Sequence, residues 1–213
     1  MTKKERASLL IEALKEKYPE AVCALCYEEA WQLLIAVRLS AQCTDKRVNM
    51  VTPALFARFS TIDAMANASE DEISSYIQSC GLYRTKAHDI KAMCGDILTR
   101  FGGRVPDTIE ELITLPGVGR KTANLIVSDV YGKPGIVVDT HFIRLSNRFG
   151  LTKEKDPVKI ENEMKKILPP KESAAFCHRI VLFGRERCTA RSPQCGECEL
   201  RHLCAEKNKG ETV

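Results

Sequence analysis

The sequence predicts an all-α fold, and three observations support that prediction. Apolar residues recur at helical spacing through most of the 213 residues. The run at residues 135–138 is the one strand-like stretch, and it is too brief to seed a sheet. The chain contains neither an internal repeat nor a low-complexity linker. We therefore expect helices joined by short loops.

The expected helices follow one another along the chain. Asp107 and Glu110 resemble a capping box that opens a helix over 109–115. A further helix starts at Asp156 and Pro157 and runs to about residue 168, where two prolines stop it. Apolar spacing places the other helices at residues 8–14, 30–39, 48–59, 70–79, 87–101 and 173–184.

The composition excludes several classes of protein. With 44% apolar and 28% charged residues, the chain fits a soluble globular protein and not a disordered, collagen-like or small disulfide-stapled one. No apolar run approaches the ~20 residues that span a bilayer. The first 20 residues lack the apolar stretch of a secretory signal. We therefore expect a cytoplasmic protein with no membrane partner.

The net charge of +4 is unevenly distributed. Residues 117–148 carry five lysines and arginines against two aspartates, and residues 179–191 carry four arginines against one glutamate. Such local excesses are compatible with a nucleic-acid partner and equally with an ordinary solvated face. Charge alone favours the solvated face, so the partner has to be identified from motifs.

Four cysteines near the C-terminus form the strongest local signal. Cys188, Cys195, Cys198 and Cys204 lie within seventeen residues, among turn formers. Sites with four cysteine ligands hold either zinc or a [4Fe–4S] cluster, and spacing alone does not choose between them. The other six cysteines are expected to be small buried residues, with Cys43 the least certain because it adjoins a candidate functional residue; they are Cys23, Cys26, Cys43, Cys80, Cys94 and Cys177.

A glycine-rich segment, LPGVGRKT at 115–122, joins two expected helices. Pro116 ends the first helix, and Gly117 and Gly119 permit positive φ and leave backbone amides uncovered. The unpaired N–H groups at the start of the next helix can bind a phosphate. The segment therefore predicts a helix–hairpin–helix element that binds DNA without reading bases. The alternative is an ordinary corner between two helices.

Lys121 and Asp139 are candidate catalytic residues. A neutral lysine amine can attack an electrophilic carbon such as sugar C1′, and a helix N-terminus disfavours the charged ammonium form. A carboxylate can accept a proton or stabilise an oxocarbenium-like charge. Taken alone the pair is weak evidence, because Lys121 could contact phosphate and Asp139 could cap a helix.

Five motifs in this order resemble the endonuclease III family of DNA glycosylases. They span most of the chain, and their combination is highly specific although no single one is. The motifs are LSAQCTD (39–45), GLYRTKA (81–87), LPGVGRKTAN (115–124), VDTH (138–141) and the four-cysteine segment (188–204).

The resemblance implies a two-domain helix–hairpin–helix glycosylase fold with the active site between the domains. A six-helix barrel domain carrying the hairpin would cover about residues 22–133. Residues 1–21 and 134–213 together would form a domain that holds a [4Fe–4S] cluster.

The resemblance also implies roles for individual residues. Lys121 would be the nucleophile and Asp139 the catalytic carboxylate. Gln42 and Leu82 would fill the gap left by an extruded base, and His141 would contact the DNA nearby. The cluster ligands would be Cys188, Cys195, Cys198 and Cys204, and the phosphate contacts would come from Gly117, Val118, Gly119 and Arg191.

The implied activity is base excision on damaged double-stranded DNA by a monomer. The damaged nucleotide is flipped out of the duplex, the lysine displaces the base, and β-elimination from the Schiff base cuts the abasic strand. Oxidised pyrimidines and abasic sites are the expected substrates.

Three alternatives differ from this interpretation. A superfamily glycosylase for adenine or alkylated bases would typically lack a lysine at position 121. A non-catalytic DNA-binding module stapled by zinc would need neither Lys121 nor Asp139. A redox iron–sulfur protein acting on another partner would leave the hairpin, Gln42 and Leu82 without a purpose.

Overall fold

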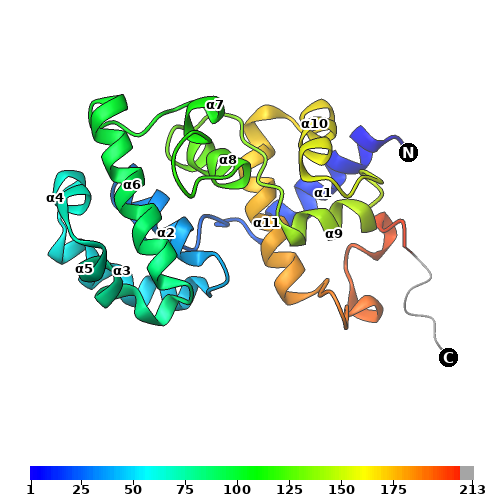
Figure 1. The fold of residues 1–213 in the computed structure, drawn as a ribbon. Helices are drawn as coiled ribbons and strands as arrows, with labels where there is room; N and C mark the ends of the chain where they lie inside the picture. The colour runs from blue at the N-terminus through cyan, green and yellow to red at the C-terminus, as the bar shows by residue number, and fades with distance from the viewer. Residues whose placement is uncertain (207–213) are drawn as a thin grey trace. The chain divides into compact units, whose positions relative to one another are not determined.

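The computed structural model describes residues 1–206 and confirms the all-α prediction. Within these residues every regular element is helical, and residues 135–138 run through an irregular loop (Figure 1). None of the helices in the described part of the chain has the length and apolar character needed to cross a membrane.

The chain folds into two compact units. The continuous unit is Cys23–Gly132, and the two-segment unit combines Met1–Val22 with Lys133–Val213. Each unit buries its own core.

The continuous unit is built around α2 (Ala30–Ser40) and α6 (Tyr83–Phe101). The middle of α2 is apolar on every side and fully buried, because α3, α6 and α8 all pack against it. Helix α6 also packs against α4 and α5, and it ends at Gly102 in the left-handed conformation typical of a C-cap. The remaining elements are α3 (Asp45–Arg58), α4 (Ile62–Asn67), α5 (Glu70–Ile77), η1 (Gln78–Cys80), α7 (Ile109–Leu112) and α8 (Arg120–Asp129).

The two-segment unit is held together by α11 (Ser173–Glu186), which packs on both α1 (Lys3–Lys17) and α9 (Thr140–Arg148). Its core contains an edge-to-face pair, Phe142 and Phe176, with ring centroids 6.1 Å apart. Because α1 contributes fully buried leucines to the same core, the N-terminal segment is joined to the later one by apolar contacts. The other elements are α10 (Pro157–Ile167), η2 (Pro170–Glu172), η3 (Cys195–Glu197) and η4 (Arg201–Leu203).

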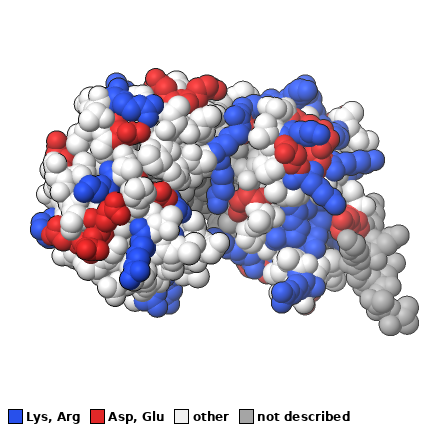
Figure 2. All heavy atoms as spheres, viewed as in Figure 1, with Lys and Arg blue, Asp and Glu red and all other residues white. Residues whose placement is uncertain are grey.

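Lysine and arginine side chains gather on the two-segment unit. Figure 2 shows them over α9, α10 and the segment that follows α11. Opposite charges are interspersed, as in the ion pairs of Lys17 with Glu199 at 2.7 Å and Lys3 with Glu163 at 3.4 Å.

Several helix ends differ from the sequence prediction. The capping box at Asp107 was wrong: Thr108 is the N-cap and accepts from the Glu111 N–H, because the chain turns one residue later. Helix α7 then ends at Leu112 and not at residue 115. Helix α6 begins at Tyr83, four residues before its expected start, because Leu82 takes the left-handed conformation at its N-cap.

Candidate functional site

Two loops of the continuous unit carry residues in an unusual backbone conformation. Gln42 and Leu82 have φ of 55° and 49°, and they are the non-glycine residues with positive φ in residues 1–206. Residues other than glycine rarely adopt this backbone conformation, and those that do are concentrated at functional sites. Leu82 is also 59% exposed although it is apolar. A Cβ placed on Gly81 would lie 3.9 Å from the Gln42 carbonyl oxygen, so the two loops are neighbours.

The expected hairpin lies between α7 and α8. Gly117 has φ of 72°, and a Cβ there would come within 2.9 Å of the Arg38 side chain. Arg38 is held in place by Asp89, whose Oδ2 lies 2.6 Å from Nη2 and 2.7 Å from Nε. Position 117 therefore requires glycine for two reasons, its φ and the close approach of a fixed ion pair.

The N-terminus of α8 is open to a ligand. Gly119 is the N-cap and supplies no side-chain cap, and a Cβ there would meet nothing within 4 Å. The first-turn N–H groups of a helix lack partners inside the helix, and the helix dipole adds positive potential there. Val118 is only 7% exposed, so its side chain offers little to a ligand, and its N–H donates to the Leu115 carbonyl at 3.1 Å, which holds the turn. These features suit a phosphate.

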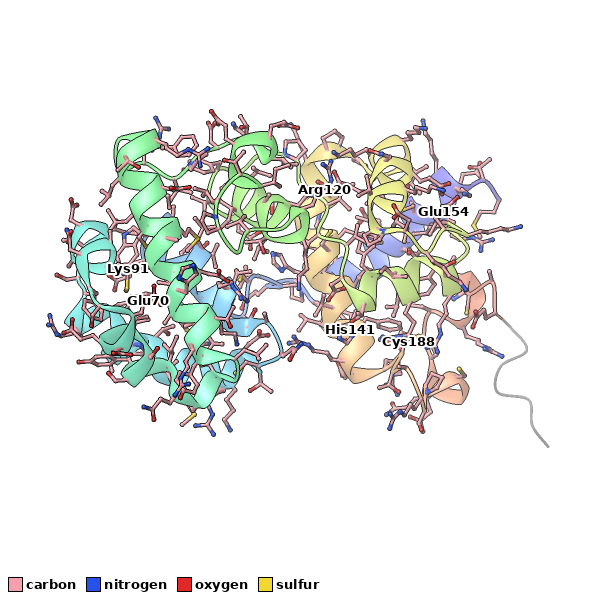
Figure 3. The ribbon with its side chains drawn as sticks, viewed as in Figure 1. Glu70, Lys91, Arg120, His141, Glu154 and Cys188 are labelled. Carbon is pink, nitrogen blue, oxygen red and sulfur yellow. The ribbon has the colours of Figure 1, made fainter. Side chains whose placement is uncertain are left out.

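Lys121 follows at the second position of α8, beside Arg120, which Figure 3 labels. The Lys121 side chain is exposed, and its amine makes no hydrogen bond or ion pair within residues 1–206. An amine that is neither buried nor paired remains available to attack a ligand.

Asp139 and His141 lie at the start of α9 in the two-segment unit. Asp139 is the N-cap, and its Oδ1 accepts from the Phe142 N–H at 2.7 Å. Burial lowers the pKa of His141, although Asp139 opposes this. His141 Nδ1 lies 3.1 Å from Arg144 Nη2, and a Cβ on Gly184 would come within 2.8 Å of it. The imidazole is thus fixed against α11, and its burial favours the neutral form.

The four cysteines of the C-terminal segment line one cavity together with Phe149 and Phe183. Their donor set is entirely sulfur, and all four side chains are half-buried. Within residues 1–206 no three ligand side chains stand close enough to share a single ion. A set of thiols around one cavity fits a multi-iron cluster better than a single zinc ion.

Arginines of α9 hold the first cysteine of this segment. Arg148 donates to Cys188 Sγ at 3.1 Å and to the Thr189 carbonyl at 2.8 Å. Arg144 donates to the Cys188 carbonyl from both Nε and Nη2. Figure 3 labels Cys188, which follows α11, and His141 on α9. Because Arg144 also contacts His141, the cysteine segment and the first turn of α9 share one polar network.

Two arginines close to Cys188 in sequence, Arg187 and Arg191, differ in their partners. Arg191 is exposed and has no partner within residues 1–206. Arg187 instead donates to Gln194 and pairs with Glu197 at 3.2 Å. Arg187 therefore stabilises the segment itself and leaves Arg191 as the residue available to a ligand.

Two protein-family models and many known proteins match this chain. Residues 35–170 match the model of the HhH-GPD superfamily base excision DNA repair protein, and residues 188–204 match that of the iron–sulfur binding domain of endonuclease III. Endonuclease III of Synechocystis sp. is 48% identical over 204 residues, covering 95% of this chain and 93% of that protein. The chain belongs to the endonuclease III family.

A second relative and two solved structures are also similar to this chain. Endonuclease III of Bacillus subtilis is 41% identical over 200 residues, which are 93% of this chain and 91% of that protein. A solved structure described as a trapped endonuclease III–DNA covalent intermediate superimposes with a TM-score of 0.92 at 41% identity, covering 98% of this chain and 99% of that one. A thermostable thymine-DNA glycosylase, at 21% identity and a TM-score of 0.87, shares the fold.

Membership in the endonuclease III family establishes the class of activity. The protein is a DNA-binding enzyme of base excision repair, a DNA glycosylase and abasic-site lyase. Its cofactor is a [4Fe–4S] cluster, and the matched iron–sulfur segment begins at Cys188 and ends at Cys204.

Sequence reasoning missed three groups that support the site. They are the Arg38–Asp89 pair beneath Gly117, the buried Lys86, and the arginines of α9 behind Cys188. Lys86 had a signal, since it falls on the apolar stripe of Ile90, Met93 and Ile97 on α6. The Arg38–Asp89 pair had none, because its partners lie far apart in sequence.

Proposed function

We propose that the protein releases oxidised pyrimidines from double-stranded DNA and cuts the abasic strand through a Schiff base on Lys121. One observation carries this proposal: an exposed, unpaired lysine stands in the first turn of α8, directly after an uncapped glycine hairpin. A phosphate bound at that helix start would hold the strand beside the amine. A relative's structure is described as a trapped covalent DNA intermediate, which supports an amine nucleophile in this family.

In this proposal Lys121 supplies the bond-forming amine. Its Nζ attacks C1′ of an extruded nucleotide, and the glycosidic bond breaks as the base leaves. The sugar ring then opens to give an imine between Nζ and C1′. Loss of a proton from C2′ breaks the C3′–oxygen bond, which cuts the strand on the 3′ side.

Asp139 acts as the carboxylate of the same reaction. Its Oδ1 is anchored by the Phe142 N–H, so the carboxylate is held in a fixed orientation. It accepts the proton that the lysine must lose before attack, and it stabilises positive charge that develops on the sugar. The N-cap role and the catalytic role are therefore compatible in one residue.

The remaining assigned residues bind the DNA. The hairpin Gly117, Val118 and Gly119 would bind a phosphate at the start of α8, with the Val118 N–H holding the turn through the Leu115 carbonyl. Arg191 would bind another phosphate from the two-segment unit. Gln42 and Leu82 would enter the gap left by the extruded base, since both stand on adjacent loops and Leu82 presents apolar surface. His141 would contact the strand near the gap as a neutral donor or acceptor.

The four cysteines would hold the cluster as thiolates. When bound, the cluster fixes the segment 188–204 by iron–sulfur bonds and so orders the backbone that carries Arg191. Arg148 and Arg144 serve the same purpose from α9, because they bind the Cys188 sulfur and carbonyl. We further propose that residues 22–133 form the six-helix barrel domain, residues 1–21 and 134–213 the cluster domain, and that the protein acts as a monomer.

The test is borohydride trapping on a duplex with one abasic site. Wild-type protein is expected to give a covalent adduct, and Lys121→Ala none. Lys121→Arg keeps the positive charge but cannot form a neutral amine, so it should bind DNA without trapping. Lys46→Ala, which removes another exposed lysine of the continuous unit, is the control and should trap normally. Trapping by Lys121→Arg would refute the assignment.

A further inference from the structure

A buried lysine joins the two loops that carry Gln42 and Leu82. Lys86 on α6 is 0% exposed. Its Nζ donates to the Leu39 carbonyl at 2.8 Å and also to the Cys80 carbonyl. Leu39 lies three residues before Gln42, and Cys80 lies two before Leu82. The Lys86 amine therefore holds the backbone of both loops. These two hydrogen bonds offset the cost of burying the amine.

Two cysteines lie on these neighbouring loops. A Cβ on Gly81, which follows Cys80, would lie 3.9 Å from the carbonyl oxygen of Gln42, which precedes Cys43. The Cys43 side chain acts on the pKa of the Cys80 thiol, and both thiols act on the pKa of the Lys86 ammonium. Cys43 adjoins Gln42 and is half-buried, so solvent reaches it, whereas Cys80 is fully buried. Burial raises the pKa of Cys80 to about 11, while the Lys86 ammonium acts in the opposite direction.

This arrangement differs from that of the ordinary buried cysteines. Cys94 lies on α6 as well and is fully buried, but burial is the only influence on its thiol pKa, which rises to about 12. Cys94 therefore behaves as a small apolar residue. Cys43 and Cys80 combine what Cys94 lacks: a second thiol on the neighbouring loop, a nearby cation and, at Cys43, access for a small oxidant.

We propose that Cys43 and Cys80 form a dithiol modification site that a peroxide converts into a disulfide joining the Gln42 loop to the Leu82 loop. The Cys43 thiolate attacks one peroxide oxygen, giving a sulfenic acid and, after protonation, water. The Cys80 sulfur then displaces the hydroxyl from the Cys43 sulfur, and the thiol proton leaves with it as a second water. Two thiols and one hydrogen peroxide thus become one disulfide and two waters.

The bond would alter the two loops. The sulfur atoms of Cys43 and Cys80 must close to about 2.05 Å when a disulfide forms. Cys43 and Cys80 lie one and two residues from Gln42 and Leu82, so the closure must shift residues held at positive φ. This consequence rests on the proposed function, in which both residues fill the gap left by an extruded base. Oxidation is then expected to slow base release reversibly.

The first experiment detects the bond without using activity. Holoenzyme is treated with hydrogen peroxide, its remaining thiols are alkylated, and the protein is digested with trypsin. Cys43 falls alone in the tryptic peptide 39–46 and Cys80 alone in 59–84. A linked pair of these peptides that dithiothreitol separates is the expected result. Absence of the pair at peroxide levels that leave the cluster's visible absorption intact would overturn the proposal.

The second experiment measures the effect on the reaction. Oxidised wild type should release base about tenfold more slowly or worse, because displacement of site residues by ~1 Å can cost 10²-fold. Dithiothreitol should restore the rate. Cys43→Ser should be insensitive to peroxide, while Cys26→Ser, which removes an exposed cysteine elsewhere in the continuous unit, should respond like wild type.

The outcomes separate the two proposals. A linked peptide pair with an unchanged rate would overturn the effect on base release, and equal inactivation of Cys43→Ser would assign that inactivation to another group. If reduced wild type neither releases base nor traps DNA, the proposed function fails, and the peptide result still decides whether the dithiol forms.

Discussion

The two units differ in charge and in how they form their parts of the site. The continuous unit carries 11 lysines and arginines against 13 aspartates and glutamates, a net charge of −2. The two-segment unit carries 21 against 15, a net charge of +6. The hairpin that would bind phosphate thus belongs to a unit without excess positive charge. Its affinity must come from backbone amides and geometry, while long-range attraction to DNA comes from the other unit.

The same contrast holds for individual residues. In the continuous unit the site depends on backbone conformation, with positive φ at Gln42, Leu82 and Gly117. In the two-segment unit it depends on side chains, with Asp139 capping α9 and Arg148 bonded to Cys188. Substitutions in the continuous unit should therefore act by straining the backbone. Substitutions in the two-segment unit should act by removing a charge or a reacting group.

Apart from Lys121, the largest effect is expected at Asp139. Asp139→Asn keeps an acceptor for the Phe142 N–H, so α9 remains capped. It removes the carboxylate, and base release should fall about 10²-fold or more. Single-turnover base release and the thermal midpoint should be measured together. A loss of folding with no separate loss of rate would make Asp139 a purely structural cap.

The next effect tests the role of backbone geometry in the continuous unit. Gly117→Ala places a Cβ at positive φ within 2.9 Å of the fixed Arg38 side chain. We expect it to destabilise the protein by about 1–3 kcal/mol. Gly119→Ala is the matched control, since its φ is −94° and its Cβ would meet nothing within 4 Å. Urea denaturation of both variants checks this, and equal stabilities would contradict the account.

A smaller effect tests where the electrostatic attraction lies. Arg191→Ala removes a positive charge from the two-segment unit. The slope of the logarithm of the DNA-binding constant against the logarithm of salt concentration should become shallower by about one. Arg104→Ala removes an exposed arginine from the continuous unit and should leave the slope nearly unchanged. DNA-binding constants of both variants are measured over a series of salt concentrations. A larger change of slope for Arg104→Ala than for Arg191→Ala would contradict the proposed division of charge between the units.

The smallest effect concerns one histidine in each unit. Glu70, 2.9 Å away, raises the pKa of His88, whereas burial lowers that of His141. The His88 pair therefore stabilises the fold at low pH and loses that contribution as the pH rises through the folded-state pKa. His141 stabilises the fold at higher pH and loses that contribution as the pH falls through its folded-state pKa. NMR titration should find His88 above His141, and Glu70→Gln should lower the pKa of His88 alone.

Local sequence features predicted most of the helices but not their ends, and α4 and α9 were not among the expected helices. Apolar spacing placed α2, α6, α10 and α11, because each turns an apolar stripe toward a core. The start of α6 was misplaced because no local signal predicts a left-handed leucine at position 82. The cap at Thr108 was assigned to Asp107 because both residue types cap helices and the sequence does not show where the chain turns.

The candidate site residues could be named from the sequence where they lie in short motifs. The hairpin glycines, the four-cysteine segment and the lysine after the hairpin could all be named from their spacing and family resemblance. The supporting pairs could not, because Arg38 and Asp89 are 51 residues apart and Lys86 and Leu39 are 47 apart. Contacts of that range depend on how α2 and α6 pack. The same packing places Cys43 and Cys80 on neighbouring loops, whereas the sequence predicted six separate buried cysteines. That prediction was wrong for Cys23 and Cys43, which are half-buried, and for Cys26, which is exposed.

The proposed reaction requires Lys121 as the nucleophile, and locating the covalent bond to DNA tests this requirement. Wild-type protein is trapped by borohydride on an abasic duplex, digested with protease and nuclease, and analysed by mass spectrometry for the reduced sugar adduct. The account predicts the adduct on Lys121, because its amine is exposed and unpaired at the open start of α8. An adduct on another lysine or on the N-terminal amine would contradict it.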